Sequence, residues 1–370
     1  MKSHKKYLFA SATDFVNGKL TGAHRRFLEL ISYIAQTEKV AFVGRTNPQL
    51  ENIKNITIYP IDPDIGANLP KHVAGGLAIF QVLKKNKDLL ECDYAVSFGP
   101  PTTICYWLAG VKHIVSLFRE DLIGYHKALL ASKKRVAYFQ LQERIAVKVS
   151  EKIIVQCKND RRNLIERNKR YCQNLADKVF IQINNSNASW MNTDSVKKTE
   201  VGNTPKILFI GNFSDRRKGH SMLLPAVMQL QEEGFHFELL CAGDGKELND
   251  WKNTCEKYPA IHFLGHIKNM KEYLVKSDMM IVPSLIDSCP NTVLEGLNAG
   301  IAVYGSNTGG IPDLLQDNEY LFEPNEQSIY AFLKSILESN RYLSDSARQQ
   351  DIKNVLCFDW GEKIKKLIEQ

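Results

Sequence analysis

Short runs of apolar, β-branched and aromatic residues alternate along the chain with longer segments of helical periodicity. The first half contains seven such runs, at 7–12, 39–44, 57–60, 93–98, 113–118, 152–156 and 178–183. After a stretch rich in Asn, Ser and Thr, five more runs follow at 206–211, 237–243, 261–265, 278–284 and 301–306. Continuous apolar strands separated by helices are typical of parallel sheets covered on both faces. The pattern therefore predicts an α/β protein with two doubly wound, Rossmann-like domains and a cleft between them.

The polar stretch in the middle of the chain sets the expected domain boundaries. At 370 residues the chain is long enough for about two domains, each with its own core. We expect a first domain at 1–185, a linker at 186–204 and a second domain at 205–355. The remaining segment, 356–370, has the length and amphipathic pattern of one more helix.

The charge is unevenly distributed between the two halves. The hydrophobic fraction of 44% and the charged fraction of 24% are ordinary for a globular protein. Residues 1–200, however, hold 31 Lys and Arg against 18 Asp and Glu, whereas the rest of the chain holds 17 against 23. A basic half predicts an anionic partner. No zinc finger, recognition helix or aromatic RNA-binding pattern points to nucleic acid, so we favour an anionic membrane surface.

Targeting signals and cysteines point to the cytoplasm. The first residues resemble a signal peptide, but their apolar run is short and Asp14 follows at once, so we predict a β-strand instead. The apolar stretch 94–118 contains two prolines and a lysine, which argues against a transmembrane helix. Eight cysteines without C-x-x-C or metal-ligand spacing are expected to be free thiols. The sequence thus predicts a cytoplasmic protein, with peripheral binding at the inner face of the cell membrane as a further hypothesis.

A lysine follows the first strand of the second half. The loop "GNFSDRRKGHS" at 211–221 places Lys218 beside the predicted start of a helix. A lysine there can hold a diphosphate, because it adds a cation to the unpaired N–H groups of the helix N-terminus. Taken alone, the segment is also compatible with a solvated turn.

Two acids lie around the start of another predicted helix, in "DSCPNTVLEGLNAG" at 287–300. Asp287 is on the loop after a buried strand, and Glu295 lies one turn inside the helix, away from its apolar face. Ser288 and Asn291 are typical helix-start residues. Carboxylates at this position can accept hydrogen bonds from sugar hydroxyls, and ligands of such sheets bind beyond the carboxyl ends of the strands.

The order and spacing of these segments resemble the retaining glycosyltransferases of the GT-B fold, specifically family 4. The motifs that match, in chain order, are Gly211, Lys218-Gly219, Gly243-Asp244-Gly245, Gly265, Pro283-Ser284, Asp287 with Glu295, and Gly309-Gly310-Ile311-Pro312-Asp313. More loosely, 17–30 resembles the Gly-rich loop and first helix of the family, with Gly22 as the residue whose amide approaches the donor phosphate. The resemblance also implies that the helix at 356–370 crosses back to the first domain.

The resemblance implies transfer of a sugar from a UDP or GDP sugar to a glycan or lipid-linked acceptor, in cell-surface polysaccharide or lipopolysaccharide biosynthesis. The nucleotide sugar is a co-substrate, and neither a metal nor another cofactor is expected. The residues implied as catalytic are Lys218, Asp287 and Glu295. Those implied in donor binding are Gly22, Asn212, Arg217, Gly243, His266, Ile267, Ser288, Asn291 and Thr292. On the acceptor side we expect Arg119 and Asp121.

Three positions depart from the family pattern. Asn212 stands where an arginine is usual, and Asp287 replaces a glutamate. Arg119-Glu120-Asp121 occupies the place of a histidine; His126 follows a little later, where we expect a surface position. Two other functions therefore stay open: a GT-B protein that binds a nucleotide sugar without turnover, and a nucleotide-sugar epimerase on the same fold. The basic segment 126–150 is either a solvated helix face or a membrane-binding face.

Overall fold

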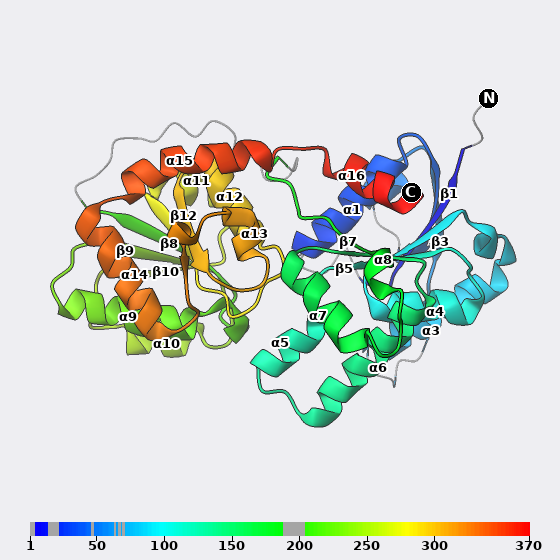
Figure 1. The fold of residues 1–370 in the computed structure, drawn as a ribbon, viewed down its shortest axis with the longest axis horizontal. Helices are drawn as coiled ribbons and strands as arrows, with labels where there is room; N and C mark the ends of the chain where they lie inside the picture. Colours follow the sequence, from blue (N-terminus) through cyan, green and yellow to red (C-terminus); the bar gives the residue numbers. More distant parts are fainter. Residues whose placement is uncertain are drawn as a thin grey trace.

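The computed structural model describes residues 4–13, 22–45, 48–62, 64–65, 68, 71–187 and 204–370. Within these residues the chain forms two parallel sheets, each covered by helices, and the two halves lie side by side (Figure 1). The predicted α/β architecture of two doubly wound domains is confirmed. Most of the predicted linker, 188–203, and the residues before Gly22 in the predicted Gly-rich loop lie outside the described residues.

The first domain contains a seven-stranded sheet in the order β3-β2-β1-β4-β5-β6-β7, with every neighbouring pair parallel. Its strands are β1 (Lys6–Ser11), β2 (Lys39–Gly44), β3 (Ile56–Pro60), β4 (Tyr94–Ser97), β5 (Ile114–Phe118), β6 (Lys152–Val155) and β7 (Val179–Ile181). Its α-helices are α1 (Gly22–Ile34), α2 (Pro48–Glu51), α3 (Lys71–Lys85), α4 (Pro100–Ala109), α5 (Leu122–Ala128), α6 (Lys133–Val149), α7 (Lys158–Asn168) and α8 (Leu175–Lys178). A 3-10 helix spans Lys87–Glu91.

The second domain contains a six-stranded parallel sheet in the order β10-β9-β8-β11-β12-β13. Its strands are β8 (Lys206–Ile210), β9 (Glu238–Ala242), β10 (Ile261–Gly265), β11 (Met279–Val282), β12 (Ala302–Ser306) and β13 (Leu321–Phe322). The helices that follow along the chain are α9 (His220–Glu232), α10 (Leu248–Thr254), α11 (Met270–Lys276), α12 (Asn291–Ala299), α13 (Ile311–Leu315), α14 (Glu326–Ser339), α15 (Tyr342–Val355) and α16 (Trp360–Glu369). Two 3-10 helices span Arg216–Lys218 and Asn318–Tyr320.

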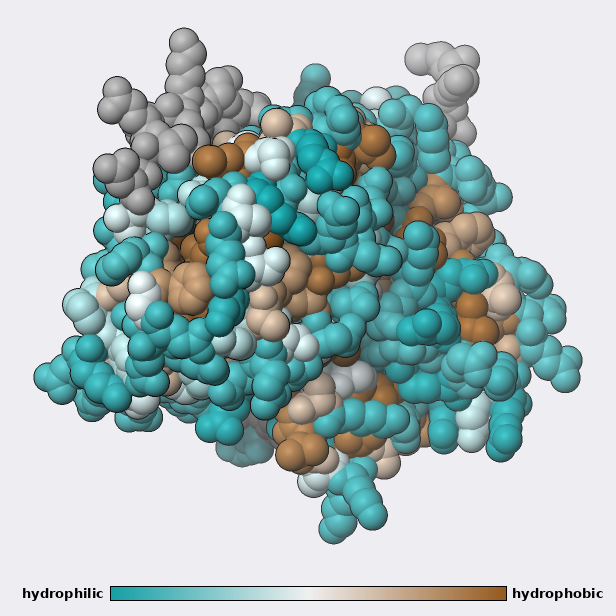
Figure 2. All heavy atoms as spheres, turned by 60° about the vertical axis from the view of Figure 1, so that its left-hand side comes forward, coloured by the Kyte–Doolittle hydropathy of each residue, from teal (hydrophilic) through white to brown (hydrophobic). Residues whose placement is uncertain are grey.

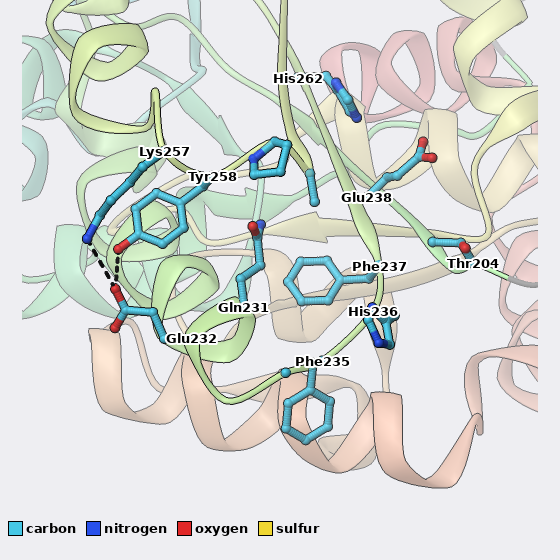
Figure 3. A pocket seen from close by; sticks show the side chains of 13 residues that line it. Thr204, Gln231, Glu232, Phe235, His236, Phe237, Glu238, Lys257, Tyr258 and His262 are labelled. Carbon is cyan, nitrogen blue, oxygen red and sulfur yellow. Dashed lines mark hydrogen bonds and ion pairs between the residues drawn. The ribbon is translucent and has the colours of Figure 1, made fainter.

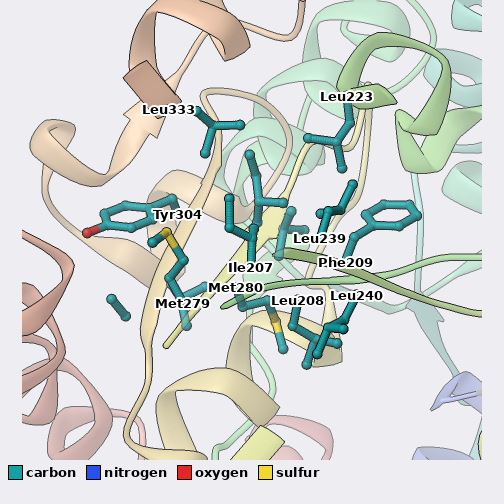
Figure 4. Packing of buried hydrophobic residues seen from close by; sticks show 14 of the residues in the cluster. Ile207, Leu208, Phe209, Leu223, Leu239, Leu240, Met279, Met280, Tyr304 and Leu333 are labelled. Carbon is teal, nitrogen blue, oxygen red and sulfur yellow. The ribbon is translucent and has the colours of Figure 1, made fainter. Parts of the chain in front are cut away.

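The strands form the core of each domain because helices cover both faces of each sheet. Every residue of β5 and of β11 is buried, as their uninterrupted apolar sequences predict. Figure 4 shows Ile207, Leu239 and Met279 of three neighbouring strands in the second domain on the same side of the sheet as Leu223 of α9 and Leu333 of α14. The buried residues form one cluster in the second domain and three in the first, and the loops at the strand ends extend from these cores.

The chain passes between the two domains twice, and the two crossings touch. The first follows β7, and the second joins α15 to α16, which packs on α1 of the first domain (Figure 1). Trp360, Ile364 and Ile368 of α16 are buried in the core of the first domain. The backbone N–H of Ser186 in the first crossing donates to the carbonyl oxygen of Leu356 in the second, at 2.9 Å. This hydrogen bond joins the two crossings.

Candidate active site

The carboxyl ends of the second-domain strands face the first domain and gather the predicted motif residues at one edge. Parallel pairing places the ends of β8, β9, β10 and β11 at the same edge of the sheet. The backbone N–H of Gly243, after β9, donates to the carbonyl oxygen of Gly265 at the end of β10, at 2.8 Å. His266 and Ile267 come next, His266 exposed and Ile267 half-buried. These loops thus form one continuous rim.

The loop after β8 places Lys218 against the end of β11. Gly219 follows Lys218 with φ of +78°, and a β-carbon there would overlap the carbonyl oxygen of Pro283. Only glycine allows this approach of the two loops. The backbone N–H of Leu285 also donates to the carbonyl oxygen of Arg217, at 2.8 Å. Lys218 is therefore held at the rim by backbone geometry.

Lys218 and Asp287 form an ion pair at this edge. The Nζ atom of Lys218 lies 2.7 Å from Oδ2 of Asp287, and their side chains are 22% and 13% exposed. The backbone of Asp287 is fixed in turn, because its carbonyl oxygen accepts the N–H of Gly310 at 2.9 Å. The Gly-rich turn predicted before α13 thus supports the loop that holds Asp287. A cation and a carboxylate in contact at a strand end match the residue types needed for a phosphate and a sugar hydroxyl.

Glu295 lies one turn inside α12, on the side away from the buried Val293 and Leu297. Its side chain is half-buried, and its carboxylate makes no hydrogen bond with any residue that the structure describes. Burial raises the pKa of Glu295 to about 7, although nearby cations, first Arg25 and then Lys218, act in the opposite direction. At neutral pH the carboxyl group is therefore close to half ionised. A buried acid without a protein donor is a site for a ligand that brings its own donors.

Helix α1 of the first domain meets the start of α12 directly. Figure 1 shows α1 extending from the first domain toward the second. At Gly22, the first residue of α1, a β-carbon would overlap the side chain of Asn291. The absence of a side chain at Gly22 thus allows two helix N-termini to adjoin, and unpaired N–H groups at such ends favour an anion.

A polar contact from the end of the first sheet fixes the same helix start. Asn184, just beyond β7, donates through Nδ2 to the side-chain oxygen of Asn291 at 3.2 Å and to the carbonyl oxygen of Cys289 at 3.3 Å. Ser288, just before these positions, is buried, and Thr292 in the first turn of α12 is half-buried. Asn291, one of the predicted donor-binding residues, therefore forms part of the contact between the domains.

Asn212, where the family pattern has arginine, caps its own loop. Its side-chain oxygen accepts the backbone N–H of Ser214 at 2.7 Å, as in an Asx turn. Of the two arginines that follow, Arg216 pairs with Glu247 at 2.8 Å. Asn212 therefore supplies no charge to the rim, and Arg216 is engaged away from it.

Arg217 reaches across to the first domain. Its guanidinium forms ion pairs with Asp215 at 2.9 Å and with Glu120 of the first domain at 3.1 Å. The same group lies 5.0 Å from the centre of the Tyr125 ring. The sequence did not predict a role at the site for Glu120 or Tyr125. For Glu120, the run of three charged residues after β5 could have indicated one.

The two residues expected on the acceptor side have other partners. Arg119 donates to Asn184 at 3.0 Å and stacks near Trp360, with its carbon Cζ 5.5 Å from the ring centre. Asp121 accepts the backbone N–H of Gly124 at 2.9 Å, which caps α5, and its side chain is 1% exposed. Of the three charged residues after β5, Glu120 is the one that faces the second domain.

A small apolar cavity lies beside these residues at the ends of β4 and β5. Its volume is about 80 Å³, and its walls include Phe98, Phe118, Leu122 and Phe139. His126, expected at the surface, is buried and stacks on Phe139 with ring centres 4.4 Å apart. Its imidazole thus contributes to packing under α6.

A second, shallow pocket lies far from the rim. Its volume is about 730 Å³, and it is formed where α9 ends and where β9 and β10 begin, at the amino-terminal edge of the sheet (Figure 3). Glu232 there is hydrogen-bonded to Tyr258 and lies 3.5 Å from Lys257. The pocket contains none of the predicted site residues.

The eight cysteines are free thiols, as predicted. Among the described residues, no group of three or more His, Cys, Asp or Glu side chains is arranged to hold a metal ion.

Comparison with known proteins gives a consistent relationship. Residues 204–339 match the family of glycosyl transferases group 1. The chain is 30% identical to the protein CapJ of Staphylococcus aureus over 136 residues, which are 35% of this chain and 34% of CapJ. It is similar in structure to Anabaena HepE in complex with UDP-glucose, with a TM-score of 0.70, 16% identity and 99% of both chains covered. It is also similar to WaaG, a glycosyltransferase involved in lipopolysaccharide biosynthesis, with a TM-score of 0.68, 16% identity, and 98% of this chain and 99% of that chain covered.

These relationships establish the fold over nearly the whole chain, and the family match lies in its second domain. At 16% identity the structural likeness shows a shared architecture. It confirms the predicted GT-B fold. The chain spans about a third of the length of CapJ, since the match covers 34% of that protein.

Proposed function

We propose that this chain, whose residues 204–339 match the family of glycosyl transferases group 1, is a glycosyltransferase that uses a nucleoside-diphosphate sugar. The observation that supports this most directly is the Lys218–Asp287 ion pair at the strand edge, with the carboxylate of Glu295, which has no hydrogen-bonding partner among the described residues, on the helix that follows. HepE, which shares the fold, was solved with UDP-glucose. A UDP or GDP sugar is therefore the proposed donor.

The proposed roles follow from the charge and position of each group. Glu295 accepts hydrogen bonds from the ribose hydroxyls, and Asp287, with the backbone N–H groups of the non-proline residues at 288–292, binds the hydroxyls of the sugar. Lys218 and the amide of Gly22 offset the charge that develops on the departing diphosphate. In the structure Lys218 is paired with Asp287. The diphosphate of a bound donor would therefore compete with Asp287 for Lys218. These groups allow charge stabilisation without a metal ion.

We propose retention of configuration, which the resemblance to the retaining glycosyltransferases of family 4 implies. In a same-face displacement the acceptor hydroxyl attacks the carbon from which the diphosphate leaves, and a phosphate oxygen takes the hydroxyl proton. The proposed acceptor is a glycan or a lipid-linked sugar of a cell-surface polysaccharide or lipopolysaccharide. WaaG, with the same fold, is described as acting in lipopolysaccharide biosynthesis.

Incubation with a panel of UDP and GDP sugars tests this proposal. Slow hydrolysis of one donor to free nucleoside diphosphate and sugar is expected, with the released sugar first in the configuration of the donor by NMR. A nucleotide sugar changed at one carbon would indicate the epimerase instead. Binding without release of nucleoside diphosphate would support the non-catalytic alternative, which the position of Asn212 favours because it adds no charge to the rim.

We also propose that the first domain binds an anionic membrane surface, through the turn between α5 and α6. The segment 126–150 contains this turn rather than one continuous helix. Leu130 in the turn is 92% exposed, and the exposed Lys133, Lys134 and Arg135 follow it. Hydrophobic side chains gather at the lower end of the molecule in Figure 2, where this turn lies in Figure 1. Among the described residues, no helix is both long and apolar enough to span a bilayer.

Co-sedimentation with vesicles tests the membrane surface. With Lys133, Lys134 and Arg135 all changed to alanine, binding to vesicles with anionic lipid should fall by up to about 100-fold, since each such residue adds ~1 kcal/mol. The same change at Lys84, Lys85 and Lys87, the basic cluster around the end of α3, is the matched control. Equal binding by the two variants, or no binding by the wild type, would contradict membrane binding through this turn. A soluble acceptor would then be the simpler proposal.

A further inference from the structure

The start of α7 in the first domain packs on the start of α13 in the second. Gly310, the N-cap of α13, lies between them. A β-carbon at Gly310 would overlap the carbonyl oxygen of Ser288 and would lie 2.8 Å from the β-carbon of Cys157, the N-cap of α7. An approach this close leaves no room for a side chain. The glycine therefore allows α7 to reach the loop that follows β11.

Asp313 caps α7 across the boundary between the domains. The backbone N–H of Lys158, the first residue of α7, donates to Oδ2 of Asp313 at 2.7 Å. N–H groups in the first turn of a helix have no partner within the helix, and the helix dipole favours a carboxylate there. The ammonium group of Lys158 also lies 3.4 Å from Asp313, but the side chain of Lys158 is 82% exposed, so this ion pair contributes little. The contact is therefore mainly a cap on the helix backbone.

The same end of α13 is packed against the backbone of Asp287 and Ser288. The N–H of Gly310 donates to the carbonyl oxygen of Asp287 at 2.9 Å. A β-carbon at Gly309 would overlap the carbonyl oxygen of Asp287, just as one at Gly310 would overlap that of Ser288. The two backbone segments are thus in direct contact. A shift of α13 would move the backbone of Asp287 with it.

We propose that Asp313 is a positioning residue: by capping α7 of the first domain, it holds α13 and the adjoining backbone of Asp287 in the arrangement that binds the sugar of the donor. This rests on the proposed function, in which Asp287 and the backbone N–H groups after it bind the sugar hydroxyls. Glu295 and Lys218, assigned to the ribose and the diphosphate, come from other elements, α12 and the loop after β8. Loss of the cap should therefore weaken recognition of the sugar more than recognition of the nucleotide.

The cap can be removed from either side. Asp313→Ala removes the acceptor, and Lys158→Pro removes the N–H donor. Proline is favoured at the first position of a helix, and Cys157 before it has extended backbone (φ −152°, ψ 167°), as a residue before proline requires. Lys158→Pro should therefore leave α7 formed. Lys158→Ala, which keeps the N–H and removes only the exposed ammonium group, is the matched comparison for the proline.

Calorimetric titration with UDP-glucose, UDP-N-acetylglucosamine and GDP-mannose, each beside its nucleoside diphosphate, tests this proposal. For a donor that the wild type binds, the dissociation constant of the nucleoside diphosphate divided by that of the donor measures what the sugar adds. Loss of one helix cap typically weakens a contact by a factor of about 5, so Asp313→Ala and Lys158→Pro should each lower this ratio about 5-fold. Affinity for the nucleoside diphosphate should be kept. The double variant should lower the ratio no further, because both changes remove the same contact.

Three further variants separate the cap from a general loss of stability. Asp313→Asn should keep most of the ratio, because its amide oxygen can still accept the N–H of Lys158. Lys158→Ala should do the same. Asp359→Ala removes a cap of the same kind within the first domain, since Asp359 accepts the N–H of Glu362 in α16 at 2.8 Å. It should lower the free energy of unfolding and leave the ratio unchanged.

Contrary results distinguish this inference from the proposed function. If Asp313→Ala weakens the donor and the nucleoside diphosphate equally, or leaves the ratio unchanged, the positioning role is overturned while the proposed function stands. A ratio as low in Lys158→Ala as in Lys158→Pro would assign the effect to the ammonium group and would also overturn the cap. If the wild type binds none of these nucleotides, the proposed function fails and this inference with it.

Discussion

Glu295 in the second domain and Asp121 in the first are both largely withdrawn from solvent near the carboxyl edge of their sheets, but their electrostatic states are opposite. Burial raises the pKa of Glu295 to about 7, and the neighbouring cations offset burial only in part. Burial acts on Asp121 as well, but the ion pair with Arg167 at 2.9 Å and the N–H of Gly124 outweigh it and lower its pKa.

The difference distinguishes a binding residue from a structural one. Arg167 also pairs with Glu143 at 2.8 Å, so Asp121 belongs to a network that joins α5, α6 and α7 and needs no ligand. Glu295 has no hydrogen-bonding partner among the described residues and lies where two helix N-termini meet. Both acids follow a buried strand; what separates them is whether the protein itself satisfies the carboxylate.

The largest effect is expected from Lys218→Ala. Removal of one preorganised charge opposite the departing diphosphate should lower turnover of the donor by at least about 100-fold. The measurement is release of nucleoside diphosphate under saturating donor, with circular dichroism to verify the fold. Turnover within a few-fold of the wild type would contradict this role for Lys218. Stabilisation of the diphosphate would then be assigned to Arg217, which lies on the same loop and pairs with Glu120.

Glu295→Ala should weaken donor binding next most strongly. Loss of a charged acceptor for ribose hydroxyls costs about 1.5–3 kcal/mol, or roughly 10- to 150-fold in affinity. Calorimetry with the preferred nucleoside diphosphate measures this directly. Glu319→Ala, at an exposed acid of the same domain, is the control, and equal affinity of the two variants would contradict the role of Glu295.

Periodicity was sufficient to predict the fold, because burial on both faces leaves each strand a continuous apolar run. The strand "DMMIVPS" is an example: four of its residues form β11, and all four are buried. Turn positions within the segment 126–150 were not predictable in the same way. Leu130, an apolar residue, lies exposed in the α5–α6 turn with φ of +52°, and no glycine or proline marks that position.

The second-domain edge was easier to predict than the first for a related reason. Lys218, Asp287 and Glu295 are placed by local geometry, that is, by a strand end, a turn and one helical turn, and local spacing is visible in sequence. Whether Arg119 or Glu120 faces the cleft depends instead on contacts with Asn184 and Arg217, which are 65 and 97 positions away. Such tertiary partners leave no periodic signal.

Asp121→Asn should affect stability and leave donor affinity unchanged. A neutral amide in place of a buried carboxylate paired with Arg167 should lower the free energy of unfolding by about 2 kcal/mol at pH 7. Because the pKa of Asp121 is lowered in the folded state, its contribution is complete above its unfolded pKa and is lost as pH falls through the folded value. The difference between variant and wild type in urea unfolding should therefore shrink below about pH 4. Glu166→Gln, at an ion pair about 60% exposed, should change stability by less than about 0.5 kcal/mol.

The smallest effect, Glu295→Gln on stability, should have the opposite sign. The pKa of Glu295 is raised in the folded state, so the folded protein holds this proton more tightly than the unfolded chain, and stability falls as pH rises from about 4.5 to 7. A glutamine of the same shape carries no such dependence and should be more stable than the wild type by about 1 kcal/mol at pH 8, after allowance for solvent screening of a half-buried group. At pH 5 the free energies of unfolding of the two proteins should be nearly equal.

Urea unfolding at both pH values measures this difference. A variant less stable than the wild type at pH 8 would mean that Glu295 is satisfied by the protein, as Asp121 is. A gain in stability together with a loss of donor affinity would show that this acid is retained for the ligand at the expense of the fold.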